Sequence, residues 1–240
     1  MQTPVYRSQN FDLLHLEIPQ FRYGQHAIFH DTSIDLVLNG WTGLVGRSGI
    51  GKTTLMRCLG GLERLRTPLK TALMTQNDQL LPWKTTLENI VLPCVMQRRK
   101  PDYTHAKHLL AMVGLQSHET ALPQELSTGM RQRVALARTL YQDADLVLLD
   151  EPFGALDALT REQLYPLMVT ALKNKTVLMV SHDPQEIMRL SHRVYLMSGK
   201  PACLYYLEYP IHGEVPRALT HPFVNRYASD LVVQLQEHWS

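Results

Sequence analysis

The 240-residue chain carries 24 Lys and Arg residues against 22 Asp and Glu residues, a length that allows one sizeable core with a smaller appended lobe. Its formal net charge of +2 provides no general field for a polyanion, so nucleic acid is not an expected partner. Its three cysteines are far apart, which argues against a zinc site or a disulfide framework and favours a reducing cytosol. No apolar run approaches the roughly eighteen residues of a spanning helix, so neither export nor membrane insertion is expected.

Four short apolar runs are expected to form buried strands, and each ends on a polar or glycine-rich turn. They are GLVG at 43–46, TALMTQ at 71–76, LVLLDE at 146–151 and TVLMVSH at 176–182. Continuous rather than alternating apolar patterns indicate strands covered on both faces, and helical patterns follow several of them. The predicted fold class is therefore α/β with a mostly parallel sheet, whose carboxyl edge is the expected ligand site.

Residues 82–142 are expected to form a helical subdomain inserted into this core, because their apolar residues recur at three- and four-residue intervals. One predicted apolar stripe consists of Leu109, Met112, Val113 and Leu115. Trp83, Met96 and Met112 are expected in the core or in a subunit contact rather than around a cofactor. The predicted organisation is one domain over 1–240, with its core at 1–81 and 143–200 and an accessory tail at 201–240 that ends in an amphipathic helix.

The segment GRSGIGKTT fits the pattern G-x-x-x-x-G-K-[ST] and stands between an expected strand and an expected helix. Glycines let backbone N–H groups turn toward phosphate oxygens, and the next helix adds unpaired N-terminal donors. Lys52 is expected against the β- and γ-phosphates, with the Thr53 hydroxyl as a magnesium ligand. A glycine-rich turn that binds nothing is the disfavoured alternative. The predicted nucleotide-binding residues of this segment are Gly46, Arg47, Ser48, Gly49, Ile50, Gly51, Lys52, Thr53 and Thr54.

Four polar residues stand at the ends of the other apolar runs. Asp150 and Glu151 are adjacent, so strand alternation points them differently, and one can hold magnesium while the other addresses a water beside the γ-phosphate. The Gln76 amide can ligate magnesium and orient water, and the His182 imidazole can bind a γ-phosphate and hold the attacking water. Alone, each would more often be a strand-end or surface residue; their shared placement favours function.

These residues form six motifs whose order, over residues 18–200, resembles that of the ATP-binding subunit of an ABC transporter. GRSGIGKTT resembles Walker A, Gln76 the Q-loop, and LSTGM at 126–130 the signature motif. LVLLDE resembles Walker B with Glu151 as its catalytic glutamate, ALDA at 155–158 the D-loop, and His182 the switch histidine. Tyr23 resembles the A-loop aromatic that stacks on adenine, although a core strand aromatic fits nearly as well. The resemblance implies a P-loop NTPase core with an inserted helical subdomain.

The resemblance also implies cofactors and partners. ATP and Mg²⁺ are the expected ligands, with Thr53, Gln76 and Asp150 at the metal. The nucleotide is expected between two copies of the chain, so that Ser127 and Gly129 of one copy complete the site of the other. Asp157 belongs to the D-loop of the same interface. An integral membrane permease, a substrate-binding protein acting indirectly and a place on the cytoplasmic face of the inner membrane follow from the family.

Two features depart from the family pattern. Thr128 and Met130 replace the first glycine and the glutamine of the usual LSGGQ signature, which removes an amide and adds a Cβ to a tight turn. Lys52 and Gln76 are only 24 residues apart (76 − 52), so the peripheral antiparallel sheet is expected to be trimmed, with RLRTPLK as a bare connection. Most of the charge of Arg131, Arg133 and Arg138, after the signature, is expected on a solvated helix face.

The segments LLPW and DEPFGALDALTREQL resemble the nitrate, sulfonate and taurine importer ATPases, a branch that also serves the pyrimidine precursor of thiamine. Leu80, Leu81, Pro82 and Trp83 are therefore the expected contacts with the membrane subunit. One alternative is a soluble ABC ATPase that acts as a nucleotide-dependent switch. A P-loop kinase for a small molecule is another, but it leaves LSTGM, ALDA and His182 without a role.

Overall fold

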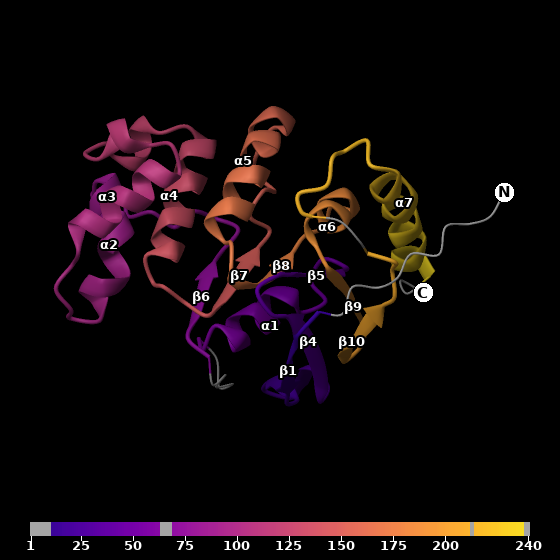
Figure 1. The fold of residues 1–240 in the computed structure, drawn as a ribbon. Helices are drawn as coiled ribbons and strands as arrows, with labels where there is room; N and C mark the ends of the chain where they lie inside the picture. The colour runs from indigo at the N-terminus through magenta and orange to yellow at the C-terminus, as the bar shows by residue number, and fades with distance from the viewer. Residues whose placement is uncertain (1–10, 63–68, 212–213, 238–240) are drawn as a thin grey trace. The chain divides into compact units, whose positions relative to one another are not determined.

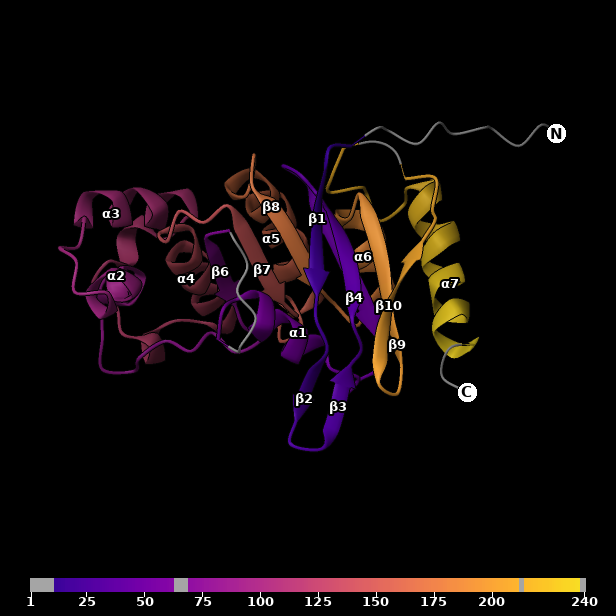
Figure 2. The same cartoon turned by 90° about the horizontal axis from the view of Figure 1, so that it is seen from below.

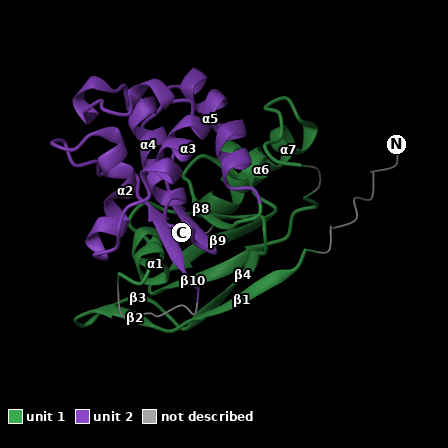
Figure 3. Cartoon of the chain, turned by 60° about the vertical axis from the view of Figure 1, so that its left-hand side comes forward, with its two compact units in different colours: residues 1–68, 174–240 green, residues 69–173 purple. Residues whose placement is uncertain are grey.

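The structure is a computed structural model that describes residues 11–62, 69–211 and 214–237 (Figure 1). The chain divides into two compact units: residues 1–68 with 174–240, called unit 1, and residues 69–173, called unit 2 (Figure 3). Unit 2 contains the predicted helical subdomain at 82–142 together with the flanking strands and one further helix. The predicted boundaries of that subdomain, 82 and 142, are narrower than those of unit 2, and they remain a prediction.

Unit 1 is organised around strand β5 (Trp41–Gly46), which pairs in parallel with β8 (Thr176–Val180) and with β9 (Arg193–Gly199). Every residue of β8 and the first five of β5 are buried, as expected for strands covered on both faces. The sheet continues through β10 (Ala202–Leu207), which runs antiparallel to β9 and meets β3 (His26–Phe29). β10 lies in the segment expected to be an accessory tail, so the sheet extends further along the chain than predicted.

Two antiparallel pairs complete the strands described in unit 1 (Figure 2). β2 (Phe21–Tyr23) pairs with β3, and β1 (Leu13–Ile18) pairs with β4 (Thr32–Val37) over six residues. Between Lys52 and Gln76 the described residues form helix α1 (Lys52–Leu59) and strand β6 (Thr71–Met74). Most of RLRTPLK, the predicted bare connection, lies outside the described residues.

Helices α6 (Pro184–Leu190) and α7 (Pro222–Glu237) pack against each other in unit 1. Asp183 caps α6 by accepting a hydrogen bond from the Gln185 N–H at 2.8 Å. The far end of α6 is closed by Arg217, whose Nη1 donates to the carbonyls of Met188 and Ser191, both at 2.9 Å. The segment before α7 therefore holds the helix that follows His182. α7 is the predicted amphipathic helix.

In unit 2, β6 pairs in parallel with β7 (Leu146–Asp150). Its helices are α2 (Thr86–Met96), α3 (Tyr103–Met112), α4 (Thr128–Leu140) and α5 (Ala158–Ala171). Thr85 and Glu88 form a capping box at the start of α2, and Asp102 caps α3. The four predicted strands are thus confirmed as β5, β6, β7 and β8, paired in parallel within each unit.

The predicted apolar stripe is correct for Leu109, Val113 and Leu115, which are buried, but wrong for Met112, which is 43% exposed. The buried face of α3 follows residues 106, 109, 110 and 113, and Met112 falls beside it. Trp83 and Met96 are 72% and 76% exposed. A place in the core is therefore excluded for all three, and the subunit-contact alternative remains. Over the described residues, every helix is too short or too polar to cross a bilayer.

Candidate nucleotide-binding site

The GRSGIGKTT segment forms the turn between β5 and α1 in unit 1. Gly49 and Gly51 have φ values of 77° and 117°, which only glycine adopts readily. A Cβ at Gly51 would also lie 2.8 Å from Ile28 Cγ2. α1 begins at Lys52 with no side chain capping its first turn, so backbone N–H groups supply the donors that an anion needs.

Lys52 is 7% exposed, and its ammonium lies across the turn. Its Nζ donates to the carbonyl of Gly46 at 2.8 Å and to that of Arg47 at 3.0 Å. An incoming phosphate can replace these neutral acceptors with a charged one, which makes a stronger hydrogen bond. Arg47, Ser48, Gly49 and Thr53 are exposed, and Thr54 and Ile50 are partly buried, so the segment is accessible from solvent.

A cavity of about 310 Å³ in unit 1 brings the start of this turn together with His182. Gly46, Arg47 and Ser48 lie on one side, and Ser181 and His182 on another. The remaining polar and apolar lining comes from Val45, Pro184, Val232, Leu235 and Gln236. His182 and the start of the phosphate turn therefore line the same cavity within unit 1. The wall from α7 was not predicted, because its residues belong to the segment regarded as accessory.

Tyr23, the predicted adenine-stacking residue, is 46% exposed on β2. Its ring lies edge-on to Phe21, with centroids 4.9 Å apart. Phe21 in turn stacks on Phe29, which is fully buried. The alternative of a core aromatic is therefore wrong for Tyr23, and the core aromatics of this region are Phe21 and Phe29.

The acidic pair stands at the end of β7 in unit 2. Asp150 is 5% exposed, and Glu151 follows with a φ of 50°. Positive φ costs a non-glycine residue about 1 kcal/mol or more and departs from strand geometry. Glu151 Oε2 accepts a hydrogen bond from Gln76 Nε2 at 3.1 Å. Because β6 and β7 are parallel neighbours, the residues that follow them meet at one sheet edge, as the sequence predicted.

The LSTGM turn begins α4 in unit 2. Ser127 is the N-cap, and its Oγ accepts from the Met130 N–H at 3.2 Å. Gly129 is buried where a Cβ would lie 2.6 Å from Thr160 Cγ2. Asp157 holds Thr160 through Oδ1, at 3.0 Å from the Thr160 N, and Oδ2, at 2.6 Å from Thr160 Oγ1. The hydrogen bond from the Thr160 hydroxyl lowers the pKa of Asp157. The D-loop carboxylate and the glycine of the signature turn therefore lie against the same threonine.

Comparison with known proteins agrees with this arrangement of motifs. Residues 29–154 match the family model described as ABC transporter. An uncharacterized ABC transporter ATP-binding protein of Haemophilus influenzae is 41% identical over 210 residues, covering 82% of this chain and 88% of that protein. The chain belongs to the ABC transporter family. This ABC protein is an ATP-binding subunit with ATPase activity, as the resemblance implied.

Three further matches extend this comparison. An aliphatic sulfonates import ATP-binding protein of Mesorhizobium japonicum is 44% identical over 185 residues, 73% of each chain. Among solved structures, a dimeric bacterial ABC transporter cassette matches with a TM-score of 0.63 at 25% identity, over 77% of this chain and 92% of that one. An inward-facing, putative metal-chelate type ABC transporter matches with a TM-score of 0.72 at 22% identity, over 82% and 84%. The predicted α/β cassette fold is confirmed.

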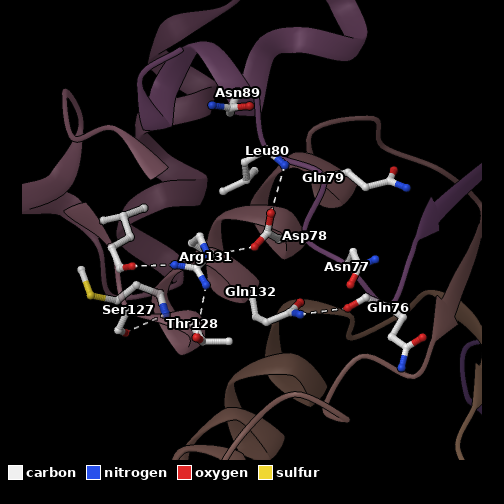
Figure 4. Close-up of polar contacts among 12 residues, drawn as sticks. Gln76, Asn77, Asp78, Gln79, Leu80, Asn89, Ser127, Thr128, Arg131 and Gln132 are labelled. Atoms are coloured by element: carbon white, nitrogen blue, oxygen red, sulfur yellow. Dashed lines mark hydrogen bonds and ion pairs between the residues drawn. The ribbon is translucent and has the colours of Figure 1, made fainter. Parts of the chain in front are cut away.

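Side-chain contacts that the sequence did not predict connect the Q-loop of this ABC subunit to α4. Gln132 Nε2 donates to the Gln76 carbonyl at 3.2 Å (Figure 4). Arg138 Nη1 donates to the Gln79 carbonyl at 2.8 Å, and its Nη2 donates to the Asp78 carbonyl. Burial lowers the pKa of the Arg138 guanidinium, and the Asp78 carboxylate opposes that shift.

The expected solvated face is therefore wrong for Arg138, and also for Arg131, which pairs with Asp78 at 2.9 Å. Their seven-residue spacing, which places both on one face of α4, was the available signal. The described residues contain no group of three or more His, Cys, Asp and Glu side chains placed to hold a metal by themselves.

Proposed function

We propose that the protein hydrolyses Mg-ATP between two copies of itself and thereby drives an importer of a small nutrient. The observation that carries the proposal is the contact between Gln76 and Glu151, which holds a carboxylate at the end of β7. We assign this carboxylate the role of general base toward the attacking water. Relatives named as aliphatic sulfonate import ATP-binding proteins support import, and a small anionic nutrient such as a sulfonate, as the transport class.

Unit 1 binds the nucleotide in this proposal. The N–H groups of the Gly46–Thr54 turn and the Lys52 ammonium bind the β- and γ-phosphates, and Tyr23 stacks on the adenine through its exposed face. Thr53, Gln76 and Asp150 would hold Mg²⁺, since hydroxyl, amide and carboxylate oxygens are the ligands this hard cation prefers. The ion would neutralise charge that develops on the phosphates.

Unit 2 supplies the hydrolytic machinery. Glu151 accepts a proton from the attacking water, and Gln76 holds the carboxylate by its hydrogen bond. His182 of unit 1 hydrogen-bonds the γ-phosphate and keeps the water in line. In the homodimer the partner's signature turn completes the site: the Ser127 oxygen already accepts from its own helix, so its O–H hydrogen can donate to a phosphate. Asp157 positions that turn through Thr160.

The permease is the proposed membrane partner, and it docks on the segment from Leu80 to Trp83. Trp83 is 72% exposed, whereas the Leu80 side chain at the start of the segment is only 9% exposed. Asn89, which is fully buried, fixes the same segment by accepting from the Leu81 N–H at 2.8 Å. An exposed aromatic on a rigid support is a suitable interface anchor. A substrate-binding protein acts on the permease, and the subunit resides on the cytoplasmic face of the membrane.

ATP hydrolysis by the purified chain, measured over a range of protein concentrations, tests the proposal. Activity is expected to rise more steeply than concentration, to require magnesium, and to fall by about 100-fold or more in Glu151→Gln. The same variant is expected to accumulate as an ATP-bound dimer in size-exclusion chromatography. Glu17→Gln, the same chemical change at an exposed position of β1, serves as the matched control. Undiminished hydrolysis in Glu151→Gln would contradict the assigned role.

A further inference from the structure

We propose that Arg131 is a positioning residue that links the permease-facing segment to the signature turn, with Asp78 and Thr128 as its two ends. This inference rests on the proposed function, because it assigns a role to the segment that docks on the permease. It goes further by naming the side chains through which that segment and the turn are coupled within unit 2. Figure 4 shows the contacts involved.

The guanidinium of Arg131 makes contacts in two directions. Its Nε donates to Asp78 Oδ2 at 2.9 Å, on the Q-loop side. Its Nη1 donates to the Leu126 carbonyl at 2.9 Å and its Nη2 to Thr128 Oγ1 at 3.2 Å, on the signature side. Because the guanidinium is planar and rigid, a displacement on one side reorients the donors on the other.

Asp78 carries the link from Arg131 into the permease-facing segment. Its Oδ1 accepts from the Leu80 N–H at 3.1 Å while its Oδ2 receives Arg131. Asn89 ties the next residues together through contacts to Leu81 and, with its Nδ2, to the Lys84 carbonyl at 3.0 Å. The segment is thus a stiff loop whose first support is the same carboxylate that binds Arg131.

Thr128 carries the link into the signature turn. It occupies a position where the usual signature has glycine, and a glycine offers no side-chain oxygen to Arg131. Thr128 lies between Ser127, the proposed phosphate ligand, and Gly129, which is packed against Thr160. A shift of the Thr128 side chain therefore acts on the two residues proposed to contact the partner's nucleotide. The departure from LSGGQ here has a specific structural role.

Arg138 and Gln132 act differently from Arg131. They donate to backbone carbonyls of residues 76, 78 and 79, so they attach the Q-loop to the body of α4 whatever the side chain at position 128. Arg131 reaches the turn itself. The effects of substitutions at Asp78 and at Thr128 should therefore be coupled to each other through Arg131. Neither substitution needs to disturb the contacts by which Gln132 and Arg138 attach α4 to the Q-loop.

Amide hydrogen exchange followed by NMR on the full chain, without nucleotide or permease, tests the link directly. Thr128→Val removes the hydroxyl but keeps the size of the side chain, and it is expected to raise exchange at the Leu80 amide about five-fold. Asp78→Asn removes the charge but keeps an oxygen for the Leu80 N–H, and it is expected to raise exchange at the Met130 amide by a similar factor. Five-fold is the low end of typical coupling between sites. Thr128→Ser, which keeps the hydroxyl, is expected to restore the parent rate.

The matched control is Asp102→Asn, the same chemical change at the N-cap of α3, where Asp102 accepts from the His105 N–H at 2.9 Å. It is expected to leave the Leu80 and Met130 amides unchanged. A cycle of Asp78→Asn and Thr128→Val in the Glu151→Gln background then measures ATP-driven dimerisation by sedimentation. Each single change is expected to weaken dimerisation about five-fold, and the double variant no more than the worse single one, because both break one link.

The outcomes separate this inference from the proposed function. Amide exchange that stays local in each variant, or fully additive losses in dimerisation, would overturn the role of Arg131 while leaving ATP-driven dimerisation intact. Absence of any ATP-driven dimer in the Glu151→Gln parent would instead count against the proposed function, and the exchange rates would still report on the link. Equal effects of Thr128→Val and Thr128→Ser would show that the hydroxyl is not the contact that matters.

Discussion

The phosphate turn of unit 1 and the signature region of unit 2 bind the same molecule in the proposed mechanism, but they are built in different ways. The phosphate turn is made by backbone: two glycines with positive φ and the uncapped start of α1. The signature region is made by side chains, with Arg131 and Arg138 reaching residues more than 50 positions away in the chain. A backbone-built site is encoded in one contiguous motif, whereas a side-chain-built site depends on the packing of separate segments.

The largest effect is expected where the backbone itself is decisive. Gly51→Ala forces an alanine to a φ of 117° and brings its Cβ within 2.8 Å of Ile28 Cγ2. Backbone strain of about 3 kcal/mol is expected, with ATP affinity reduced about 100-fold in equilibrium titration. Gly61→Ala is the control, because Gly61 also has a positive φ, of 72°, but no atom within 4 Å of the added Cβ. Equal losses in both variants would show that packing against Ile28 is unimportant.

The second expected effect is a pH dependence of the free energy of unfolding, caused by His192 in unit 1. Burial, and then the positive charge of Arg217, lower the pKa of His192 to about 4, and its Nδ1 accepts from the Trp41 N–H at 3.0 Å. In the unfolded chain His192 has an ordinary pKa of about 6.5, so it takes up a proton there before it does in the folded chain. The free energy of unfolding therefore falls as the pH drops from about 6.5 to about 4. The expected loss is about 3 kcal/mol.

Urea unfolding between pH 4 and pH 7 measures this loss. His192→Gln is the comparison, since a glutamine oxygen can accept from Trp41 without titrating, and its stability is expected to change less over the same interval. Parallel pH profiles for the two proteins would remove His192 as the cause.

The third prediction tests the packing of the signature region. Gly129→Ala places a Cβ 2.6 Å from Thr160 Cγ2, so ATP-driven dimerisation in the Glu151→Gln background is expected to weaken about ten-fold, or about 1.4 kcal/mol. Thr160→Ser removes that methyl group but keeps the hydroxyl bonded to Asp157. The double variant is expected to recover most of the loss in sedimentation experiments. Failure to recover would place the effect of alanine in the turn itself rather than in its contact with α5.

The smallest effect on stability is expected at the docking segment. Trp83 is 72% exposed, so Trp83→Ala should change the free energy of unfolding by less than about 0.5 kcal/mol and leave basal ATP hydrolysis unchanged. Copurification with the membrane subunit should be lost. Trp41→Ala is the contrast, because Trp41 is 3% exposed and its truncation should cost about 3 kcal/mol or more. Retained copurification of Trp83→Ala would exclude this surface as an anchor.

The sequence predicted more of unit 1's binding turn than of unit 2's supporting contacts. Glycine spacing, the buried strand before it and Lys52 are local features, and they indicate a phosphate turn without knowledge of any long-range contact. The pairing of Gln76 with Glu151 was also predictable, because parallel strands place their following residues at one edge. Arg131 and Arg138 were assigned to solvent because helical periodicity marks a polar face but does not say what lies against it.

Sequence alone determined the motifs, their order and the strands that carry them, since these depend on backbone conformation and on hydrophobic periodicity over a few residues. Only the tertiary structure decided that Met112 is exposed, that β10 extends the sheet, and that Thr128 meets Arg131. These outcomes depend on which side chains approach from distant parts of the chain. Packing and hydrogen bonding between such segments are set by the folded chain as a whole, and a local pattern does not contain them.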